Sequence, residues 1–269
     1  MPQPLVIYHG DCSDGFTAAW AFRKLNPSVD VEYVPAKYHQ PPPDVSDRDV
    51  YVLDFSYPRD VLLDMKRKAE SLLVLDHHKT AEADLAGLTF CVFDMERSGC
   101  GITWDYFTKS ERPWLVNIME DRDLWRFRYE DTLPIVAYAA CLPMTFEAWD
   151  QLVESQPRAI EAGTTIRLYI DKYGENASKD AVFREIGGYR VPIINISYQN
   201  CSDHLHRLCQ HHPEAPFAAS FFLRGDEQWQ FSLRSIGDFD VSEIAKEYGG
   251  GGHKHAAGFD LGDLPWRRR

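Results

Sequence analysis

Side chains that can bind a metal ion follow three short apolar runs in this chain. The runs are residues 5–8, 50–53 and 72–75, and the residues that follow them are His9, Asp54, and Asp76, His77 and His78. Short aliphatic runs of this kind are typical of buried strands in a parallel sheet. In open α/β sheets, ligands bind at the carboxyl ends of the strands. Aspartate and histidine at three such ends therefore indicate a metal-dependent active site.

The first run continues into a segment that is rich in candidate ligands. Residues 9–15 have the sequence His-Gly-Asp-Cys-Ser-Asp-Gly, a tight loop between a strand and a helix, which gathers His9, Asp11 and Asp14 around one small volume. Imidazole and carboxylate donors suit manganese, magnesium, iron or zinc, and a carboxylate-rich set favours the harder ions. Helix capping is the alternative for Asp11 or any other single residue here. His9 and Asp14 together favour metal binding.

The Asp-His-His segment at 76–78 is a stronger signal than any isolated acidic residue. The two histidine side chains diverge, so that one can bind a metal ion while the other faces the substrate. Asp76 can accept a hydrogen bond from an imidazole and so set its tautomer. Taken alone, Asp54 is more typical of a helix cap, and Asp121, in the charged segment 120–125, is more typical of a salt-bridged surface.

The composition restricts the partners and the compartment. The chain has 269 residues, a formal net charge of −12 and 44% hydrophobic residues, which suits one large or two medium domains. Proteins that coat long duplex DNA usually present a basic face, so we expect no such partner. No run approaches the ~18 apolar residues of a membrane span, and we expect no signal peptide. Six scattered cysteines without a C-x-x-C pair favour reduced thiols in the cytoplasm.

The order of the predicted elements indicates two α/β lobes. Strand-like and helix-like segments alternate from residue 5 to about residue 125, which predicts an N-terminal domain with a parallel sheet. Residues 145–182 are polar and helix-favouring, and we interpret them as bridging helices. A second strand-and-helix pattern begins at residue 189 and predicts a smaller domain with a mixed sheet. We therefore divide the chain into residues 1–140, 141–188 and 189–269.

The order of these motifs resembles the DHH phosphoesterase superfamily. The N-terminal resemblance rests on His9-x-x-x-x-Asp14-Gly15, Asp54, Asp76-His77-His78 and Asp121. The segment 249–258, Gly-Gly-Gly-Gly-His-x-x-Ala-Ala-Gly, resembles the signature of the DHHA1 domain that follows the DHH domain in this superfamily. The two signals stand in the expected order and together cover nearly the whole chain.

The resemblance implies two divalent metal ions, commonly Mn²⁺, with Mg²⁺ or Co²⁺ as alternatives. By resemblance, His9 and Asp54 hold one ion, while Asp14, Asp54, His77 and Asp121 hold the other, with Asp54 as the bridge. His78, supported by Asp76, lies beside the scissile phosphate in this family. Cys12 stands where the family usually has an additional Asp. Three alternatives follow: Asp11 replaces the missing ligand, Cys12 binds as a thiolate, or one ion binds weakly.

The glycine-rich segment predicts a substrate-binding role for the second lobe. Glycines let the backbone approach a ligand closely and direct amides at an anion, which suggests Gly250, Gly251 and Gly252 as contacts. His253 adds a donor, and Arg234, at the end of a predicted strand, adds a charged fork. The alternative is a flexible loop with a packing role.

Taken together, the residues predict a metal-dependent phosphoesterase that hydrolyses short oligonucleotides or small nucleotides through a metal-activated water. Candidate activities are a 3′-to-5′ exonuclease on short oligonucleotides, a phosphatase for 3′-phosphoadenosine 5′-phosphate, and a dinucleotide phosphodiesterase. Inorganic pyrophosphatase is disfavoured because that branch lacks the glycine signature. The rival is a non-catalytic nucleotide sensor with a degenerate metal site. A homodimer is compatible with either.

Overall fold

A computed structural model of the protein describes residues 2–38, 40–199 and 201–266. The chain divides into two compact units, residues 1–167 and 168–269. Each unit contains one sheet, and the first sheet precedes the second along the chain. Within the described residues, no helix is both long enough and apolar enough to cross a membrane.

The first unit is built on a parallel sheet of five strands in the order β2-β1-β3-β4-β5. The strands are β1 (Leu5–His9), β2 (Glu32–Ala36), β3 (Asp49–Leu53), β4 (Ser71–Asp76) and β5 (Cys91–Phe93). Alternate residues of β1 enter different cores: Val6 packs with one set of helices, while Leu5 and Ile7 pack with another. Burial on both faces explains why these strands are nearly continuous apolar runs.

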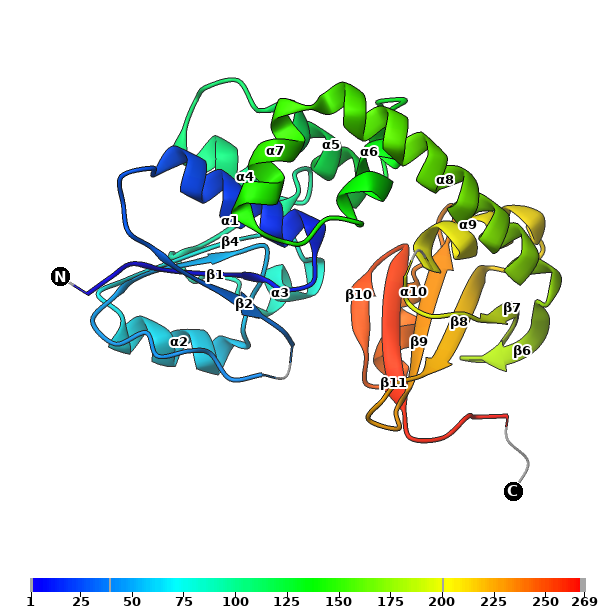
Figure 1. Cartoon of the computed structure of the whole chain (residues 1–269). Coiled ribbons are helices and arrows are strands. Elements are labelled where there is room, and N and C mark those ends of the chain that lie inside the picture. Colours follow the sequence, from blue (N-terminus) through cyan, green and yellow to red (C-terminus); the bar gives the residue numbers. More distant parts are fainter. Residues whose placement is uncertain (1, 39, 200, 267–269) are drawn as a thin grey trace. The chain divides into compact units, whose positions relative to one another are not determined.

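Helices cover both faces of this sheet (Figure 1). One face carries α2 (Arg59–Lys68), whose Leu62 and Met65 are buried. The other face carries α1 (Ser13–Leu25), α4 (Gly99–Phe107), α5 (Trp114–Asp123), α6 (Thr132–Ala139) and α7 (Phe146–Glu154). The short helix α3 (Lys79–Asp84) follows β4.

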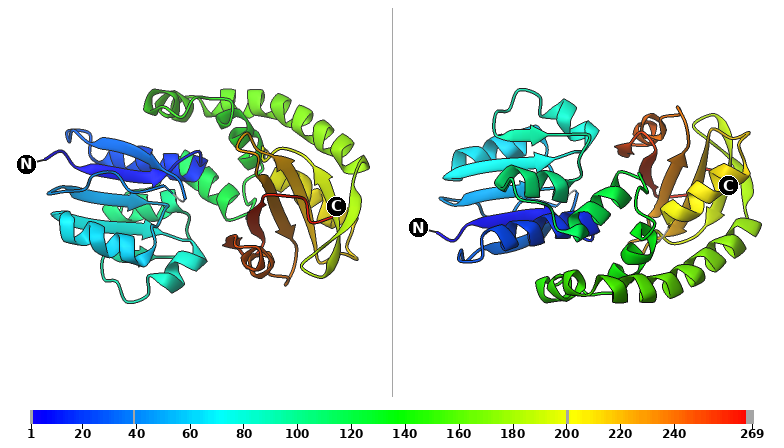
Figure 2. Two further views of the ribbon diagram at one scale, coloured as in Figure 1. Left: turned by 90° about the horizontal axis from the view of Figure 1, so that it is seen from below. Right: turned by 90° about the horizontal axis from the view of Figure 1, so that it is seen from above.

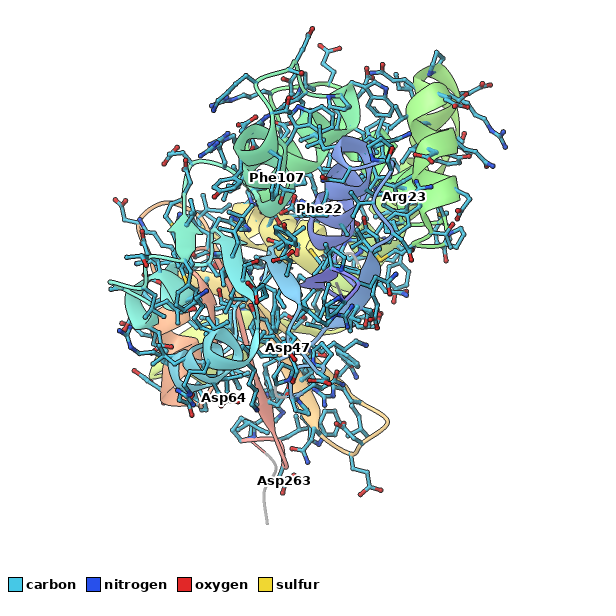
Figure 3. The ribbon with its side chains drawn as sticks, turned by 90° about the vertical axis from the view of Figure 1, so that its left-hand side faces the viewer. Phe22, Arg23, Asp47, Asp64, Phe107 and Asp263 are labelled. Atoms are coloured by element: carbon cyan, nitrogen blue, oxygen red, sulfur yellow. The ribbon has the colours of Figure 1, made fainter. Side chains whose placement is uncertain are left out.

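Aromatic side chains hold α1 to its neighbouring helices. Figure 3 shows Phe22 of α1 beside Phe107 of α4, and their ring centroids lie 5.1 Å apart. From α7, the buried Trp149 donates a hydrogen bond to Thr17 Oγ1 at 3.0 Å. Trp20 donates in turn to Asp150 Oδ1 at 2.8 Å. These contacts fix the direction of α1, whose N-terminus carries the candidate ligands.

The second unit is built on a mixed sheet of six strands in the order β10-β11-β9-β8-β7-β6. The strands are β6 (Val182–Ile186), β7 (Tyr189–Asn195), β8 (Phe217–Leu223), β9 (Trp229–Ser235), β10 (Gly251–His253) and β11 (Ala256–Leu261). Within this second sheet, β7 and β8 pair in parallel and the other described pairs are antiparallel. One core contains α10 (Val241–Glu247) and a second contains α9 (Cys201–His211). Figure 2 shows these strands in two further views.

The predicted fold class is confirmed: the α/β chain has a parallel sheet in its N-terminal unit and a mixed sheet in its smaller C-terminal unit, with helices in between along the chain. The predicted bridging region, residues 141–188, contains α7 and α8 (Gln156–Lys179), but it also contains β6, which pairs with β7 in the second sheet. The division at residue 167 falls inside α8, which is one continuous helix. β6 lies at the edge of the second sheet, and three of its five residues are exposed.

Candidate metal centre

Asp54 lies at the centre of a group of ligand-type side chains from three neighbouring strand ends. Its Oδ1 lies 3.1 Å from His77 Nε2, and its Oδ2 lies 3.5 Å from His9 Nδ1. Cys12 Sγ, in the loop after β1, lies 3.7 Å from the same Oδ2. Asp54 itself is buried. The parallel register of β1, β3 and β4 therefore brings together residues that are far apart in the sequence.

The local backbone at Asp54 is unusual and is held in place by its neighbours. Asp54 has φ = 57°, a left-handed conformation that aspartate adopts more readily than most residues. Its backbone N–H donates to Leu75 O at 2.8 Å, which continues the pairing with β4. A Cβ on Gly99 would lie only 2.3 Å from Asp54 Cβ. A side chain at position 99 would therefore displace the central carboxylate.

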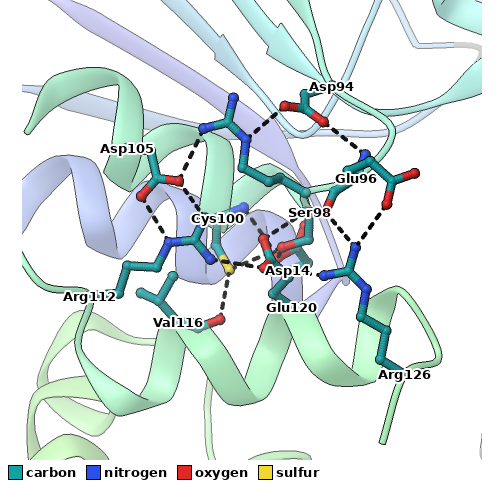
Figure 4. Close-up of polar contacts among 11 residues, drawn as sticks. Asp14, Asp94, Glu96, Ser98, Cys100, Asp105, Arg112, Val116, Glu120 and Arg126 are labelled. Atoms are coloured by element: carbon teal, nitrogen blue, oxygen red, sulfur yellow. Dashed lines mark hydrogen bonds and ion pairs between the residues drawn. The ribbon is translucent and has the colours of Figure 1, made fainter. Parts of the chain in front are cut away.

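Asp14, in the first turn of α1, is oriented by the start of α4. Its Oδ1 accepts hydrogen bonds from Ser98 Oγ at 2.7 Å and from the Cys100 backbone N–H at 3.2 Å. Glu120 supports this arrangement, because its Oε2 accepts from the Ser98 backbone N–H at 3.1 Å (Figure 4). Arg112 donates to the other Glu120 oxygen at 2.9 Å. Oδ1 of Asp14 thus accepts two hydrogen bonds, whereas Oδ2 accepts none within the described chain.

Several buried atoms in this group lack a hydrogen bond within the described chain. They are His9 Nδ1, Asp14 Oδ2 and Asp54 Oδ1. Buried polar atoms without a partner are costly, and in native proteins they commonly mark an ion or a reactive site. Ligand atoms fall into three sets whose members lie within 4.8 Å of one another: His9, Cys12 and Asp54; Asp54, His77 and His78; and Asp14, His77 and Asp123. This donor chemistry fits divalent cations.

The electrostatics of the group also favour a cation. Burial and the nearby charge of Asp54 raise the pKa of Asp14 well above its ordinary value. Burial opposes ionisation of Asp54 too, but the His77 and His9 rings outweigh it and hold the pKa of Asp54 below its usual range. Burial lowers the pKa of His77, but Asp54 and Asp123 outweigh burial and raise this pKa to about 10. Without a metal ion, a proton on His77 compensates the clustered carboxylates, and a divalent cation would replace it.

Asp76 and His78 form a second arrangement beside this group. His78 Nδ1 lies 2.7 Å from Asp76 Oδ1, and Ser56 Oγ donates to Asp76 Oδ2 at 2.6 Å. Burial raises the pKa of Asp76, but His78 outweighs it, so the pKa is lower than usual. Asp76 is fully buried, so its carboxylate is out of reach of a substrate. The His78 and His9 ring centroids lie 5.7 Å apart.

The structure does not bring Asp121 to the candidate ligands. Asp121 Oδ1 accepts from the Arg128 backbone N–H at 2.8 Å, and Oδ2 accepts from Thr132 Oγ1 at 2.5 Å, so this buried carboxylate holds the loop after α5. Asp123 takes the expected place, with Oδ2 at 3.4 Å from His77 Nε2. Residues two positions apart in a helix point about 200° apart, so Asp121 and Asp123 lie on nearly opposite faces of α5. The sequence reveals the acidic segment, but it does not reveal which face of α5 is directed at His77.

Of the two candidates for the missing ligand, only Cys12 lies with the group. Asp11 is exposed, and its carboxylate forms an ion pair with Lys37 at 2.5 Å. Its backbone has φ = 57° and forms the turn between β1 and α1. A Cβ on the nearby Gly15 would lie 2.4 Å from His9 O, which shows how closely α1 approaches the end of β1.

The glycine-rich segment of the second unit is mostly a strand rather than a loop. Residues Gly251–His253 form β10 and pair with β11. A Cβ on Gly250 would lie 2.1 Å from Gly258 O, and one on Gly252 would lie 2.4 Å from Ala256 O. Backbone packing explains those two glycines, whereas position 251 has open space around it. The sequence did not reveal this strand because glycine is rare in strand interiors.

Arg234, the predicted phosphate-binding side chain, lies in β9 and is partly held by its own unit. Its guanidinium donates to Ser202 Oγ at 2.5 Å and to Leu233 O at 2.7 Å. Arg234 pairs across the sheet with Ala256 of β11, and His253 also pairs with Ala256, from β10. Arg234 and His253 therefore occupy neighbouring strand positions on either side of β11.

Comparisons with known proteins place this architecture in a family. Residues 196–265 match the model of the DHHA1 domain. The uncharacterized protein R106 of Acanthamoeba polyphaga mimivirus is 32% identical over 296 residues, which cover 98% of this chain and 70% of that protein. The chain belongs to the DHH phosphoesterase superfamily. The predicted resemblance is thereby confirmed at the level of the superfamily.

Solved structures of DHH phosphoesterases share the fold at low sequence identity. An exopolyphosphatase-related protein from Bacteroides fragilis has a TM-score of 0.58 and 13% identity, covering 97% of this chain and 87% of that one. The pGpG-specific phosphodiesterase PggH from Vibrio cholerae has a TM-score of 0.53 and 12% identity, covering 97% and 93%. RecJ from Thermus thermophilus, in complex with Mn²⁺, has a TM-score of 0.53 and 14% identity, covering 96% and 49%.

Proposed function

We propose that this DHH phosphoesterase hydrolyses phosphate ester bonds of short oligonucleotides or small nucleotides in a reaction that requires divalent metal ions. The observation that carries the proposal is the convergence of metal-ligand side chains on buried atoms that lack hydrogen bonds in the described chain. The side chains are His9, Asp14, Asp54, His77 and Asp123, with Asp123 in place of the expected Asp121.

We infer that Asp54 is shared between two ion positions. His9 and Asp54 would hold one ion, and Asp14, His77 and Asp123 would hold the other together with Asp54. Bound divalent ions would lower the pKa of a water molecule and stabilise negative charge that develops on phosphoryl oxygens. The carboxylate-rich ligand set favours Mn²⁺, with Mg²⁺ and Co²⁺ as alternatives. Ser98 keeps one Asp14 oxygen occupied, so the other is directed at the ion.

His78 would act on the substrate, and Asp76 would position it. Because Asp76 lies against the Nδ1 side of the imidazole, His78 would contact a phosphoryl oxygen or the leaving group through Nε2. Burial opposes protonation of His78, but Asp76 outweighs this and raises the pKa of His78. A raised pKa favours the protonated imidazole, which would donate to the substrate through Nε2. Asp76→Asn would lower activity by disturbing this donor.

Small size and acidic charge of the protein support a short substrate. With a net charge of −12, the chain gives little general attraction to a polyanion, so binding must rely on local contacts and bound cations. Among proteins of similar fold, one is named for cleaving pGpG, a dinucleotide. In the second unit, Arg234, Gly251 and His253 are the residues that we propose to contact the nucleotide.

Product analysis would test the proposal most directly. The protein is freed of metal by chelation and assayed after adding Mn²⁺, Mg²⁺ or Co²⁺ separately. The substrates are RNAs of two to ten nucleotides, linear dinucleotides and 3′-phosphoadenosine 5′-phosphate. We expect metal-dependent hydrolysis of at least one of these, and little of long duplex DNA. Full activity after exhaustive chelation would contradict the metal dependence.

The second candidate function is a nucleotide sensor that does not turn over. The replacement of the family's usual Asp by Cys12 favours it, because the first ion position has one carboxylate fewer. The same panel separates the two functions. A sensor would bind one of the nucleotides, measured by calorimetry, and release no product with any of the three metals.

A further inference from the structure

The side chain of Cys12 points into the ligand group and does not cap the helix that follows it. It is the N-cap residue of α1, but its side chain makes no capping hydrogen bond. Its Sγ lies 3.7 Å from Asp54 Oδ2. The Nδ1 or Nε2 of His9, Cys12 Sγ and a carboxylate oxygen of Asp54 all lie within 4.8 Å of one another. These three donors can contact a single ion.

Two independent observations point to a ligand at this position. His9 Nδ1 is a buried atom without a hydrogen bond in the described chain, although it lies 3.5 Å from Asp54. Asp54 is only 1% exposed, and its Oδ2 faces both other donors, at 3.5 Å from His9 Nδ1 and 3.7 Å from Cys12 Sγ. The other cysteine near these residues, Cys100, donates through Sγ to a backbone oxygen, Val116 O, at 3.6 Å. Cys12 instead donates to a carboxylate oxygen of the ligand group, Asp54 Oδ2, at 3.7 Å.

We propose that Cys12 binds a metal ion as a thiolate together with His9 and Asp54, so that this position prefers a borderline ion such as Zn²⁺, Co²⁺ or Fe²⁺ over Mn²⁺ or Mg²⁺. Softer thiolate donors select these ions, whereas sets of carboxylates suit Mn²⁺ and Mg²⁺. Binding exchanges the S–H bond for a metal–sulfur bond and releases one proton to solvent. The inference rests on the metal centre of the proposed function and specifies one half of it.

The two ion positions would consequently differ in chemistry. The set proposed for the other ion position, Asp14, His77 and Asp123, contains nitrogen and oxygen donors only. It would keep the preference for Mn²⁺ that a carboxylate-rich site has. A protein loaded with two different metals, one per position, would therefore be its native form. Activity measured with Mn²⁺ alone would then be lower than the activity of the protein that carries both metals.

Cobalt spectroscopy tests the sulfur bond without relying on activity. Metal-free protein is titrated with Co²⁺, and we expect a thiolate-to-cobalt charge-transfer band in the near ultraviolet. Cys12→Ser should lose the band and bind Zn²⁺ at least ~10-fold more weakly, since even indirect supports of a metal ligand are worth about 10–100-fold in affinity. Cys12→Asp should lose the band while binding Mn²⁺ more tightly than the wild type. The exposed Cys141 provides the matched control, because Cys141→Ser should leave the band unchanged.

The outcomes separate this inference from the proposed function. Wild-type protein that binds Co²⁺ and hydrolyses nucleotides without a charge-transfer band would overturn the role of Cys12 alone. A Cys12→Ser variant with unchanged Zn²⁺ affinity would do the same. Wild-type protein that binds no divalent ion by calorimetry would overturn both. Circular dichroism of each variant establishes that a lost band does not reflect unfolding.

Discussion

At the scale of single residues, the site is organised around a carboxylate that folding alone does not explain. Asp54 is buried, adopts a left-handed backbone conformation and lies between two histidines. Strained backbone of this kind persists where the surrounding structure over-determines it, and it is often found at functional sites. A residue with a purely structural role would gain little from this environment.

Asp54→Asn should abolish turnover while leaving the metal-free protein folded. If Asp54 is shared by both ions, its loss removes a ligand from each, and kcat should fall on the order of 10³-fold or more. Bound metal per chain, measured by elemental analysis, should fall as well. The thermal midpoint of the metal-free variant should lie below that of wild type, because the lowered pKa of Asp54 means that, despite its burial, its charge stabilises the folded state through His77 and His9. A variant that retains a large fraction of its rate would contradict the shared role.

Asp121 and Asp123 should give opposite phenotypes. Asp123→Asn should weaken metal binding and lower kcat with little change in the thermal midpoint, since its side chain is 29% exposed and lies near His77. Asp121→Asn should instead destabilise the protein by roughly 1–3 kcal/mol, because buried hydrogen bonds to a charged acceptor are lost. Metal titration and thermal unfolding of both variants measure the difference. Loss of metal binding in Asp121→Asn at temperatures where it remains folded would restore the ligand set expected from the sequence.

At the scale of elements, a network of ion pairs behind the site fixes α4 against α5. Arg112 contacts Asp105 of α4 and Glu120 of α5, and Glu120 in turn accepts from the Ser98 backbone (Figure 4). Arg97 extends the network from Asp94 to Asp105. Through Ser98, the network reaches Asp14. The position of one ligand oxygen thus depends on helix packing outside the ligand group.

Asp105→Asn should destabilise the protein in a pH-dependent manner. Burial raises the pKa of Asp105, but Arg112 and Arg97 outweigh it and hold the pKa below its usual value. Its stabilisation is therefore present above the unfolded pKa of about 3.9 and is lost as the pH falls through the folded pKa. We expect Asp105→Asn to cost about 1–2 kcal/mol at neutral pH and progressively less below about pH 4. Urea unfolding of both proteins between pH 3 and 7 measures this, and a constant difference would contradict the ion-pair role.

At the scale of the whole molecule, the two units carry different parts of the proposed function. The first unit contains the candidate metal ligands, and the second contains the DHHA1 match and the residues that we propose to bind nucleotide. Interactions that are equal in the ground state and the transition state change KM, whereas metal ligands change kcat. Kinetics on two kinds of substrate can therefore assign each unit its role.

Arg234→Ala should raise KM for a nucleotide substrate roughly 10- to 100-fold with a nearly unchanged kcat, because a charge-assisted phosphate contact is worth about 1.5–3 kcal/mol. The effect should be much smaller with bis-p-nitrophenyl phosphate, which lacks a nucleotide. Arg224 is the matched control, since it is also an arginine of the second unit but pairs with Asp226 and Asp260 at the surface. Arg224→Ala should leave both KM values unchanged. An equal rise in KM for both substrates in Arg234→Ala would contradict the proposed nucleotide-binding role of the second unit.

The sequence by itself determined the fold class, the family and most of the candidate ligands. Apolar runs that end on His9, Asp54 and the Asp-His-His segment are local patterns, and parallel strands necessarily bring their carboxyl ends to one edge. Tertiary structure alone brings Asp123 rather than Asp121 beside His77, and Cys12 rather than Asp11 beside Asp54. Each pair is close in the sequence, and its members differ only in the direction that helix packing or a turn gives their side chains. The structure likewise decided that Gly251–His253 is a strand, because its partner β11 lies beyond a turn and its glycines have little strand propensity of their own.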